Sequence, residues 1–269
     1  MSQPHPIGQY LIRAEPYYRP TGDEVELYRA AYAVRMPMML KGPTGCGKTR
    51  FVEYMAWHLG RPLITIACHE DMTASDLVGR HLLDASGTRW QDGPLTLAVR
   101  FGAICYLDEI VEARQDTTVV LHPLADARRI LPLEKKAELV EAHPDFQLVI
   151  SYNPGYQSII KDLKQSTKQR FGALDFGWPP RDAEIEIVVH ESGVTADLAG
   201  GLVSVGERAR NLKGHGLDEG LSTRMLVYAG ALIAQGVEPL VACRAALVGP
   251  VTDDPDIRDA LDAVIKTFF

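Results

Sequence analysis

Gly42-Pro43-Thr44-Gly45-Cys46-Gly47-Lys48-Thr49 is the stretch that decides the fold of this 269-residue chain. It fits the pattern G-x-x-x-x-G-K-[ST], in which glycines let the backbone turn tightly enough to aim its N–H groups at phosphates. An apolar run, Pro37–Lys41, precedes the stretch. Apolar residues at helical spacing follow it, namely Phe51, Val52, Met55, Ala56 and Leu59. The stretch therefore predicts a phosphate-binding loop between a strand and a helix.

The side chains of this loop favour ATP and Mg²⁺ as its ligands. We expect the phosphates to be cradled by the backbone of six residues, Gly42, Pro43, Thr44, Gly45, Cys46 and Gly47. Lys48 would reach the β- and γ-phosphates, and the Thr49 hydroxyl would be a magnesium ligand, because hard oxygen donors suit that ion. The alternative is a glycine-rich turn with an exposed lysine, which leaves the flanking strand and helix patterns unexplained.

The first two thirds of the chain alternate short apolar runs with longer amphipathic ones, which is typical of an α/β fold with a mainly parallel, five-stranded sheet. The predicted strands are Pro37–Lys41, Leu63–Ala67, Ile104–Asp108, Leu148–Tyr152 and Ala173–Phe176. Trp178-Pro179-Pro180 ends this pattern. We therefore predict a core over residues 1–180, with an N-terminal extension over 1–20, and a small α-helical lid domain over 181–269. Its expected helices are Ala183–Glu191, Ala196–Asn211, Thr223–Ala234, Pro239–Leu247 and Asp256–Thr267.

Composition excludes several other classes of protein. The chain is 46% hydrophobic and 23% charged, as in ordinary globular proteins. A net charge of −7 argues against general nucleic-acid binding, which needs Lys and Arg to neutralise phosphates. The polar start Met1–Tyr10 predicts no secretory signal, and the apolar run Leu226–Ala234 is too short to span a bilayer, so we expect a cytoplasmic protein. The four cysteines have neither disulfide nor zinc spacing.

Two adjacent carboxylates, Asp108 and Glu109, follow the third predicted strand. Successive side chains at a strand end point in different directions, so the two can divide their work. Asp108 would hold the magnesium ion, and Glu109 would orient and deprotonate an attacking water. A solvated acidic turn is the alternative. Behind a phosphate loop the pair favours hydrolysis of ATP over transfer of its phosphate to an acceptor.

Three further polar residues are candidates for contacts with the γ-phosphate. Asn153 ends the fourth strand and could hydrogen-bond the phosphate or the water, although Asn-Pro-Gly is also a common turn. Arg170 follows a helix beside Phe171, from where its guanidinium could reach a nucleotide on another subunit. The residues alone do not distinguish it from three other arginines, Arg128, Arg129 and Arg181. Arg224, at the start of a predicted lid helix, could close onto the phosphates, although an ordinary surface arginine is the default alternative.

Together these motifs resemble the AAA+ ATPases of the MoxR branch over nearly the whole chain. The resemblance assigns six segments: Gly42–Thr49 as Walker A, Leu107–Glu109 as Walker B, Asn153 as sensor 1, Gln169–Phe171 as the arginine-finger segment, Ser222–Arg224 as sensor 2, and Trp90–Leu95 as the Gly-Pro-Leu signature. It implies a three-layer αβα core that binds ATP or ADP with Mg²⁺. The Asn-Arg that commonly follows Asp-Glu-Ile in this branch is replaced here by Val111-Glu112.

Three longer stretches narrow the resemblance to the CbbQ/NorQ/NirQ subgroup, and within it most closely to CbbQ: Asp108–Arg114, Ser151–Tyr156 and Lys164–Phe171. That resemblance implies a homo-hexamer that works with a CbbO-like partner carrying a von Willebrand factor A domain. It implies Rubisco as the client, reactivated by release of inhibitory sugar phosphates. It also implies an insert loop near residues 72–88 and a hairpin near residues 129–141, where Pro132 fits a strand poorly.

Several other functions remain as alternatives. A NorQ-like or NirQ-like ATPase that matures nitric oxide reductase is the nearest, and residue spacing does not separate it from a CbbQ-like one. A monomeric P-loop kinase and a non-catalytic, nucleotide-gated adaptor are more distant. A GTP switch is disfavoured because the chain has no Asn-Lys-x-Asp motif for reading guanine.

Overall fold

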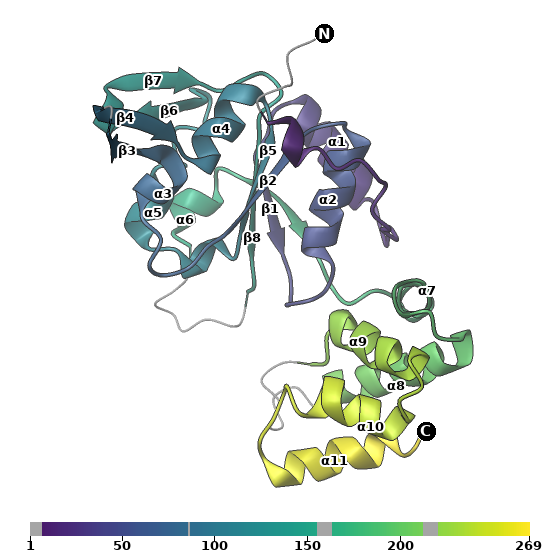
Figure 1. Cartoon of the computed structure of the whole chain (residues 1–269). Coiled ribbons are helices and arrows are strands. Elements are labelled where there is room, and N and C mark those ends of the chain that lie inside the picture. Colours follow the sequence, from purple (N-terminus) through teal and green to yellow (C-terminus); the bar gives the residue numbers. More distant parts are fainter. Residues whose placement is uncertain (1–6, 86, 155–162, 212–219) are drawn as a thin grey trace. The chain divides into compact units, whose positions relative to one another are not determined.

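The computed structural model describes residues 7–85, 87–154, 163–211 and 220–269. The chain divides into two compact units (Figure 1). The first contains Met1–Gly42 and Lys48–Phe176, and the second contains Pro43–Gly47 and Gly177–Phe269. Parts of four predicted segments lie outside the described residues, namely 1–6 of the N-terminal extension, 86 of the insert, 155–156 of the stretch 151–156, and 212–219 of the helical region.

The first unit is built on a five-stranded sheet in the order β2-β5-β8-β1-β9. Its strands are β1 Met38–Lys41, β2 Leu63–Ala67, β5 Ile104–Asp108, β8 Gln147–Tyr152 and β9 Gly172–Asp175. Every neighbouring pair in this sheet is parallel. The predicted five-stranded parallel sheet is therefore confirmed, with strand ends that differ by at most one residue from those expected.

Alternate residues of each strand enter two different apolar layers, because successive side chains point to opposite faces of a sheet. Met38 and Leu40 of β1 pack in one layer with α1 (Glu24–Ala33) and α2 (Lys48–His58). Met39 packs in the other layer, on the face covered by α3 (Ala74–Val78) and α4 (Pro94–Phe101). Figure 1 shows these two pairs of helices on opposite sides of the sheet. The unit is the predicted three-layer αβα sandwich.

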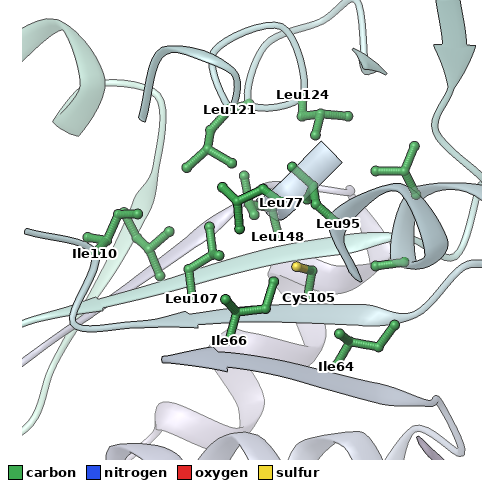
Figure 2. Packing of buried hydrophobic residues seen from close by; sticks show 14 of the residues in the cluster. Ile64, Ile66, Leu77, Leu95, Cys105, Leu107, Ile110, Leu121, Leu124 and Leu148 are labelled. Carbon is green, nitrogen blue, oxygen red and sulfur yellow. The ribbon is translucent and has the colours of Figure 1, made fainter. Parts of the chain in front are cut away.

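The second layer contains the larger cluster of buried apolar side chains (Figure 2). Leu77 of α3 and Leu95 of α4 lie over strand residues that include Leu107 and Leu148. All four are at most 2% exposed. Burying a side chain of this size stabilises the fold by about 1.5–3 kcal/mol, so this layer fixes the positions of β5 and β8. Strand β5 ends at Asp108, and Asn153 directly follows β8.

Two antiparallel hairpins are added to this sandwich, β3–β4 (Gly79–Asp84 and Gly87–Asp92) and β6–β7 (Ile130–Leu133 and Glu138–Glu141). The expected insert at 72–88 contains α3, all of β3 and the start of β4. The expected hairpin at 129–141 is present, and Pro132 lies opposite Leu139 within it. The described part of this unit also contains two short α-helices, α5 Gln115–Val119 and α6 Gln165–Lys168, and short 3-10 helices at Gly8–Tyr10, Ile110–Glu112 and Glu134–Lys136.

The helices of the second unit surround an apolar core of their own. They are α7 Arg181–Ser192, α8 Ala196–Arg210, α9 Thr223–Ala234, α10 Pro239–Cys243 and α11 Pro255–Ile265. The helix predicted over 239–247 changes at Arg244 into a π-helical turn, since Gly249 N donates to the Arg244 carbonyl five residues earlier. No helix in the described ranges has the length and apolar character needed to cross a lipid bilayer.

Candidate nucleotide site

The loop from Gly42 to Gly47 joins β1 to the N-terminus of α2, and its backbone requires glycine at three positions. Gly45 and Gly47 have φ angles of 74° and 100°, a region that other residues rarely adopt. A Cβ atom on Gly42 would lie 2.3 Å from the carbonyl oxygen of Phe176. Such a loop, followed at once by a helix N-terminus, presents backbone N–H groups and partial positive charge to an anion.

Lys48, the first residue of α2, is only 8% exposed. Its Nζ donates to the Gly42 carbonyl and to Asn153 Oδ1, both at 2.8 Å. Asn153 reaches this position because Tyr152, the last residue of β8, pairs with Lys41 of β1. The structure thus brings together two predicted site residues that are 105 positions apart. A buried ammonium held by a carbonyl and an amide is a ready donor to a phosphate.

The Asp108 carboxylate is oriented by its neighbours. Its Oδ1 accepts hydrogen bonds from Tyr106 OH at 2.7 Å and from Ser151 Oγ at 2.5 Å. Its Oδ2 lies 3.5 Å from Thr49 Oγ1. One oxygen is therefore held by the protein, while the other faces the hydroxyl of the phosphate loop. A carboxylate beside a hydroxyl fits a hard divalent cation such as Mg²⁺, which takes its remaining ligands from phosphates and water.

Two neutral groups lie near the acidic pair. Burial, and secondarily the Asp108 charge, raise the pKa of Tyr106, so its phenol stays protonated and donates to Asp108. Burial, followed by the charges of Asp108 and Glu109, raises the pKa of Cys68 to about 12. The Cys68 thiol is therefore uncharged at neutral pH. Neither group adds negative charge beside the two carboxylates.

Glu109 has a backbone conformation that is unusual for its residue type. Its φ and ψ angles are 55° and 48°, in the left-handed region, which costs a non-glycine residue about 1–3 kcal/mol. Its N–H donates to Ser151 Oγ at 2.9 Å. In the described part of the chain, no hydrogen bond or ion pair engages the Glu109 carboxylate. Local strain thus turns Glu109 away from the strand direction and leaves its carboxylate available to a ligand.

Sequence reasoning missed the roles of Ser151 and Tyr106 in this site. The Ser151 hydroxyl connects the Asp108 carboxylate to the Glu109 amide, and the residue is fully buried. A serine within the buried, mainly apolar strand β8 was the signal that could have identified it. Tyr106 precedes Asp108 by two residues, which puts both side chains on the same face of β5.

Replacing Ser151 with alanine is expected to slow ATP hydrolysis roughly 10-fold and to destabilise the fold by about 1–3 kcal/mol, because the Asp108 carboxylate and the Glu109 amide each lose a hydrogen bond. Steady-state hydrolysis and thermal unfolding measure the two effects. Tyr106→Phe is the matched control, since it removes one donor to Asp108 and leaves the Glu109 amide bound. Hydrolysis at the wild-type rate by Ser151→Ala would show that the connection through Ser151 is dispensable.

Arg170 lies two residues beyond α6, and its guanidinium donates to the backbone carbonyl of Ser166. The neighbouring Phe171 packs against the large apolar cluster of the core. Burial lowers the pKa of His122, and the positive charge of Arg170 lowers it further. Hydrogen bonds from Arg128 are the main cause of the lowered pKa of Asp126, to which the charge of Arg170 also contributes. The packing of Phe171 thus holds the backbone at Arg170 in place. Among the described contacts, the Arg170 side chain is held only by the Ser166 carbonyl.

The three other candidate arginines bind partners in their own unit. Arg128 pairs with Asp126, with Nη2 and Oδ2 2.6 Å apart, and the pKa of that carboxyl falls to about 2. Arg129 donates to the Phe146 carbonyl at 2.8 Å. Arg181 contacts its partners within the helical unit, Glu207 Oε2 at 2.5 Å and Ser204 Oγ at 2.8 Å.

Arg224 lies in the first turn of α9 and is exposed. Ser222 caps this helix by accepting a hydrogen bond from Met225 N. The second unit also contains Pro43–Gly47, and a Cβ atom on Gly45 would lie 2.7 Å from Ser222 Cβ and 3.5 Å from Arg224 Cβ. Within that unit the start of α9 therefore lies directly beside Gly45.

Two family models match the chain. Residues 37–171 match the AAA domain of the dynein-related subfamily, and residues 184–268 match the CbbQ/NirQ/NorQ C-terminal model. Two solved structures share the fold at 14% identity: a protein from Cytophaga hutchinsonii (TM-score 0.51, 91% of this chain and 89% of that one) and NtrX from Brucella abortus with ADP (0.54, 83% and 52%).

Curated relatives extend over nearly all of the chain. Protein CbbQ of Hydrogenophilus thermoluteolus is 72% identical over 262 residues, 97% of this chain and 98% of the relative. NorQ of Paracoccus denitrificans is 55% identical over 94% of both chains. NirQ of Pseudomonas aeruginosa is 55% identical over 94% of this chain and 97% of its own. The chain is therefore a nucleotide-binding AAA+ ATPase that belongs to the CbbQ/NorQ/NirQ family.

Proposed function

We propose that this ATPase is a remodelling motor that acts on Rubisco. In this proposal a homo-hexamer works with a CbbO-like partner that carries a von Willebrand factor A domain. ATP hydrolysis then drives the release of tight-binding sugar phosphates from the inhibited enzyme. The observation that carries the proposal is the 72% identity to a CbbQ protein over nearly the full length, against 55% to NorQ and NirQ proteins.

The site geometry supports a division of work among its residues. The loop backbone and Lys48 bind the phosphates, and Lys48 already has two acceptors in place that a phosphate can supplement. Thr49 and Asp108 would hold Mg²⁺, which supplies charge neutralisation for the phosphates when bound. Asn153, hydrogen-bonded to Lys48, contacts the γ-phosphate or the water.

Glu109 acts as the general base in this proposal. A general base must have a free acceptor oxygen within reach of the water that it deprotonates. The left-handed backbone at Glu109 keeps its carboxylate apart from the hydrogen bonds that hold Asp108. The proton of the water passes to the Glu109 carboxylate as the water oxygen attacks the γ-phosphorus, and ADP leaves.

Arg170 completes the site of a neighbouring subunit. Charge develops on the γ-phosphoryl group in the transition state, and a guanidinium stabilises it best when no carboxylate of its own subunit competes. Arg128 and Arg181 are each paired with a carboxylate, whereas Arg170 donates to the backbone carbonyl of Ser166. Arg224, in the first turn of α9 and beside Gly45, would contact the phosphates.

Co-purification tests the client and the partner. We expect tagged Glu109→Gln protein, with ATP added to a lysate of the native host, to retain a von Willebrand factor A domain protein and Rubisco. Lys48→Ala is the matched control, because it loses the ammonium that binds phosphate and should retain neither. Recovery of nitric oxide reductase subunits in place of Rubisco would support the NorQ-like alternative, which the 55% identity keeps as the second candidate.

A further inference from the structure

The second unit contains a buried ionic cluster that joins three of its helices. Glu184 of α7 is 1% exposed and accepts from both terminal nitrogens of Arg210, the last residue of α8, at 2.8 and 2.6 Å. The same carboxylate accepts from Thr223 Oγ1, on the first residue of α9, at 2.5 Å. The start of α9 is therefore fixed to α7 and α8 by charge-assisted hydrogen bonds.

Arg210 also holds the backbone that enters α9. Its Nε donates to the Leu221 carbonyl at 2.8 Å. Its guanidinium carbon lies 4.3 Å from the centre of the Trp178 ring, a stacking distance. A Cβ atom on Gly220 would lie 2.6 Å from Arg210 Cγ, so the chain there passes directly over this side chain. Arg210 thus fixes Gly220 and Leu221, while Glu184 fixes Thr223.

The packing of these helices does not by itself require an ionic cluster of Glu184, Arg210 and Thr223. Glu184 and Thr223 are both buried, at 1% and 6% exposure. Removing two charges from water is unfavourable, and well-packed apolar side chains often replace a buried ion pair without loss of stability. A bidentate pair with a third, directional partner instead specifies one position for the segment that it binds. That segment is 220–223, which leads directly into Arg224.

We propose that Glu184, Arg210 and Thr223 are positioning residues for Arg224, and that through it they let the protein distinguish ATP from ADP. The proposal rests on the phosphate-binding role proposed above for Arg224. The cluster fixes the backbone on the N-terminal side of Arg224, and Ser222 of the same segment lies against Gly45 of the phosphate loop within this unit. Because its backbone is fixed, the exposed Arg224 guanidinium is positioned to reach the terminal phosphate of a nucleoside triphosphate. ADP lacks that phosphate.

Thr223→Val tests the link, because valine keeps the shape of threonine and removes the hydroxyl that binds Glu184. Binding of methylanthraniloyl-labelled ATP and ADP is measured in the full-length protein with Glu109→Gln, so that the ATP analogue is not consumed. We expect the ratio of ATP affinity to ADP affinity to fall about 10-fold, in the range of one charge-assisted hydrogen bond, with ADP affinity unchanged. Thr223→Ser, which keeps the hydroxyl, should retain the wild-type ratio.

A double-mutant cycle with Arg224→Ala separates this inference from the role of Arg224 itself. We expect Thr223→Val to have no further effect on the affinity ratio once Arg224 is alanine, since coupled residues are not additive. An unchanged ratio in Arg224→Ala alone would overturn the proposed role of Arg224. If Arg224→Ala lowers the ratio but Thr223→Val changes only the melting temperature, or the two effects add, the cluster is merely structural and the positioning role is wrong.

Discussion

Replacing Glu109 with glutamine is expected to slow ATP hydrolysis by roughly 100-fold or more while ATP still binds, because an amide cannot take the proton of the attacking water. The substitution preserves the size of the side chain and leaves the hydrogen bond from the Glu109 amide to Ser151 in place. The contacts of Lys48 with Gly42 and Asn153 are also unaffected. Phosphate release measures turnover, and a fluorescent ATP analogue measures binding.

Glu141→Gln is the matched control for this experiment. It makes the same chemical change at an exposed position of β7 and should leave turnover within about twofold of the wild type, since surface substitutions away from a site have small effects. If Glu109→Gln hydrolysed ATP at the wild-type rate, Glu109 would have no part in the reaction, and its left-handed backbone would need another explanation. Loss of ATP binding in Glu109→Gln would equally contradict a role confined to the water.

The sandwich was predictable because local pattern and tertiary position agree in its strands. Each central strand is a short apolar run with a polar residue at its carboxyl end, and buried parallel strands require that pattern. The same logic predicted where the site would form, since the carboxyl ends of parallel strands meet at one edge. Lys48 and Asn153 are hydrogen-bonded there, and Asp108 Oδ2 lies 3.5 Å from Thr49 Oγ1, while the roles of these residues toward a nucleotide stay predictions.

The β3–β4 hairpin could not be predicted from its own residues. Its sequence has polar residues on both faces and gives no clear period-two pattern. It is stabilised by a cross-strand pair within the hairpin, the edge-to-face packing of His81 on Trp90, with ring centroids 5.0 Å apart. The Asp92 carboxylate at its end accepts from Arg100 Nε of α4 at 3.0 Å. Tertiary contacts of this kind override local propensity in short hairpins.

The supporting residues of the site were missed for a related reason. Ser151 acts on Asp108 and Glu109 only because β8 lies beside β5 in a register that aligns their ends. Glu184 and Arg210 meet across 26 positions and two helices, which no motif encodes. A motif identifies the groups that touch the ligand. The groups that orient them depend on strand register and helix packing, which appear only in the folded chain.

Arg170→Ala is expected to lower the turnover number for ATP by roughly 10³-fold in the assembled protein, the scale on which an arginine finger stabilises the transferring phosphoryl group. ATP affinity should change much less, because the proposed contact strengthens in the transition state. Arg128→Ala is the matched control, since its guanidinium is engaged by Asp126 in the same unit. Phosphate release is compared at protein concentrations where assembly is verified by light scattering.

Mixing two inactive variants tests whether Arg170 acts on a neighbouring subunit. Glu109→Gln subunits keep Arg170, and Arg170→Ala subunits keep Glu109, so a complete site forms wherever the first type lies beside the second in the required order. In rings reassembled from equal amounts, about one quarter of the sites should be complete, because half of the subunits carry Glu109 and half of their neighbours carry Arg170. Recovered hydrolysis at that level supports action between subunits. No recovery, with mixed rings verified by mass spectrometry, would mean that Arg170 acts within its own subunit.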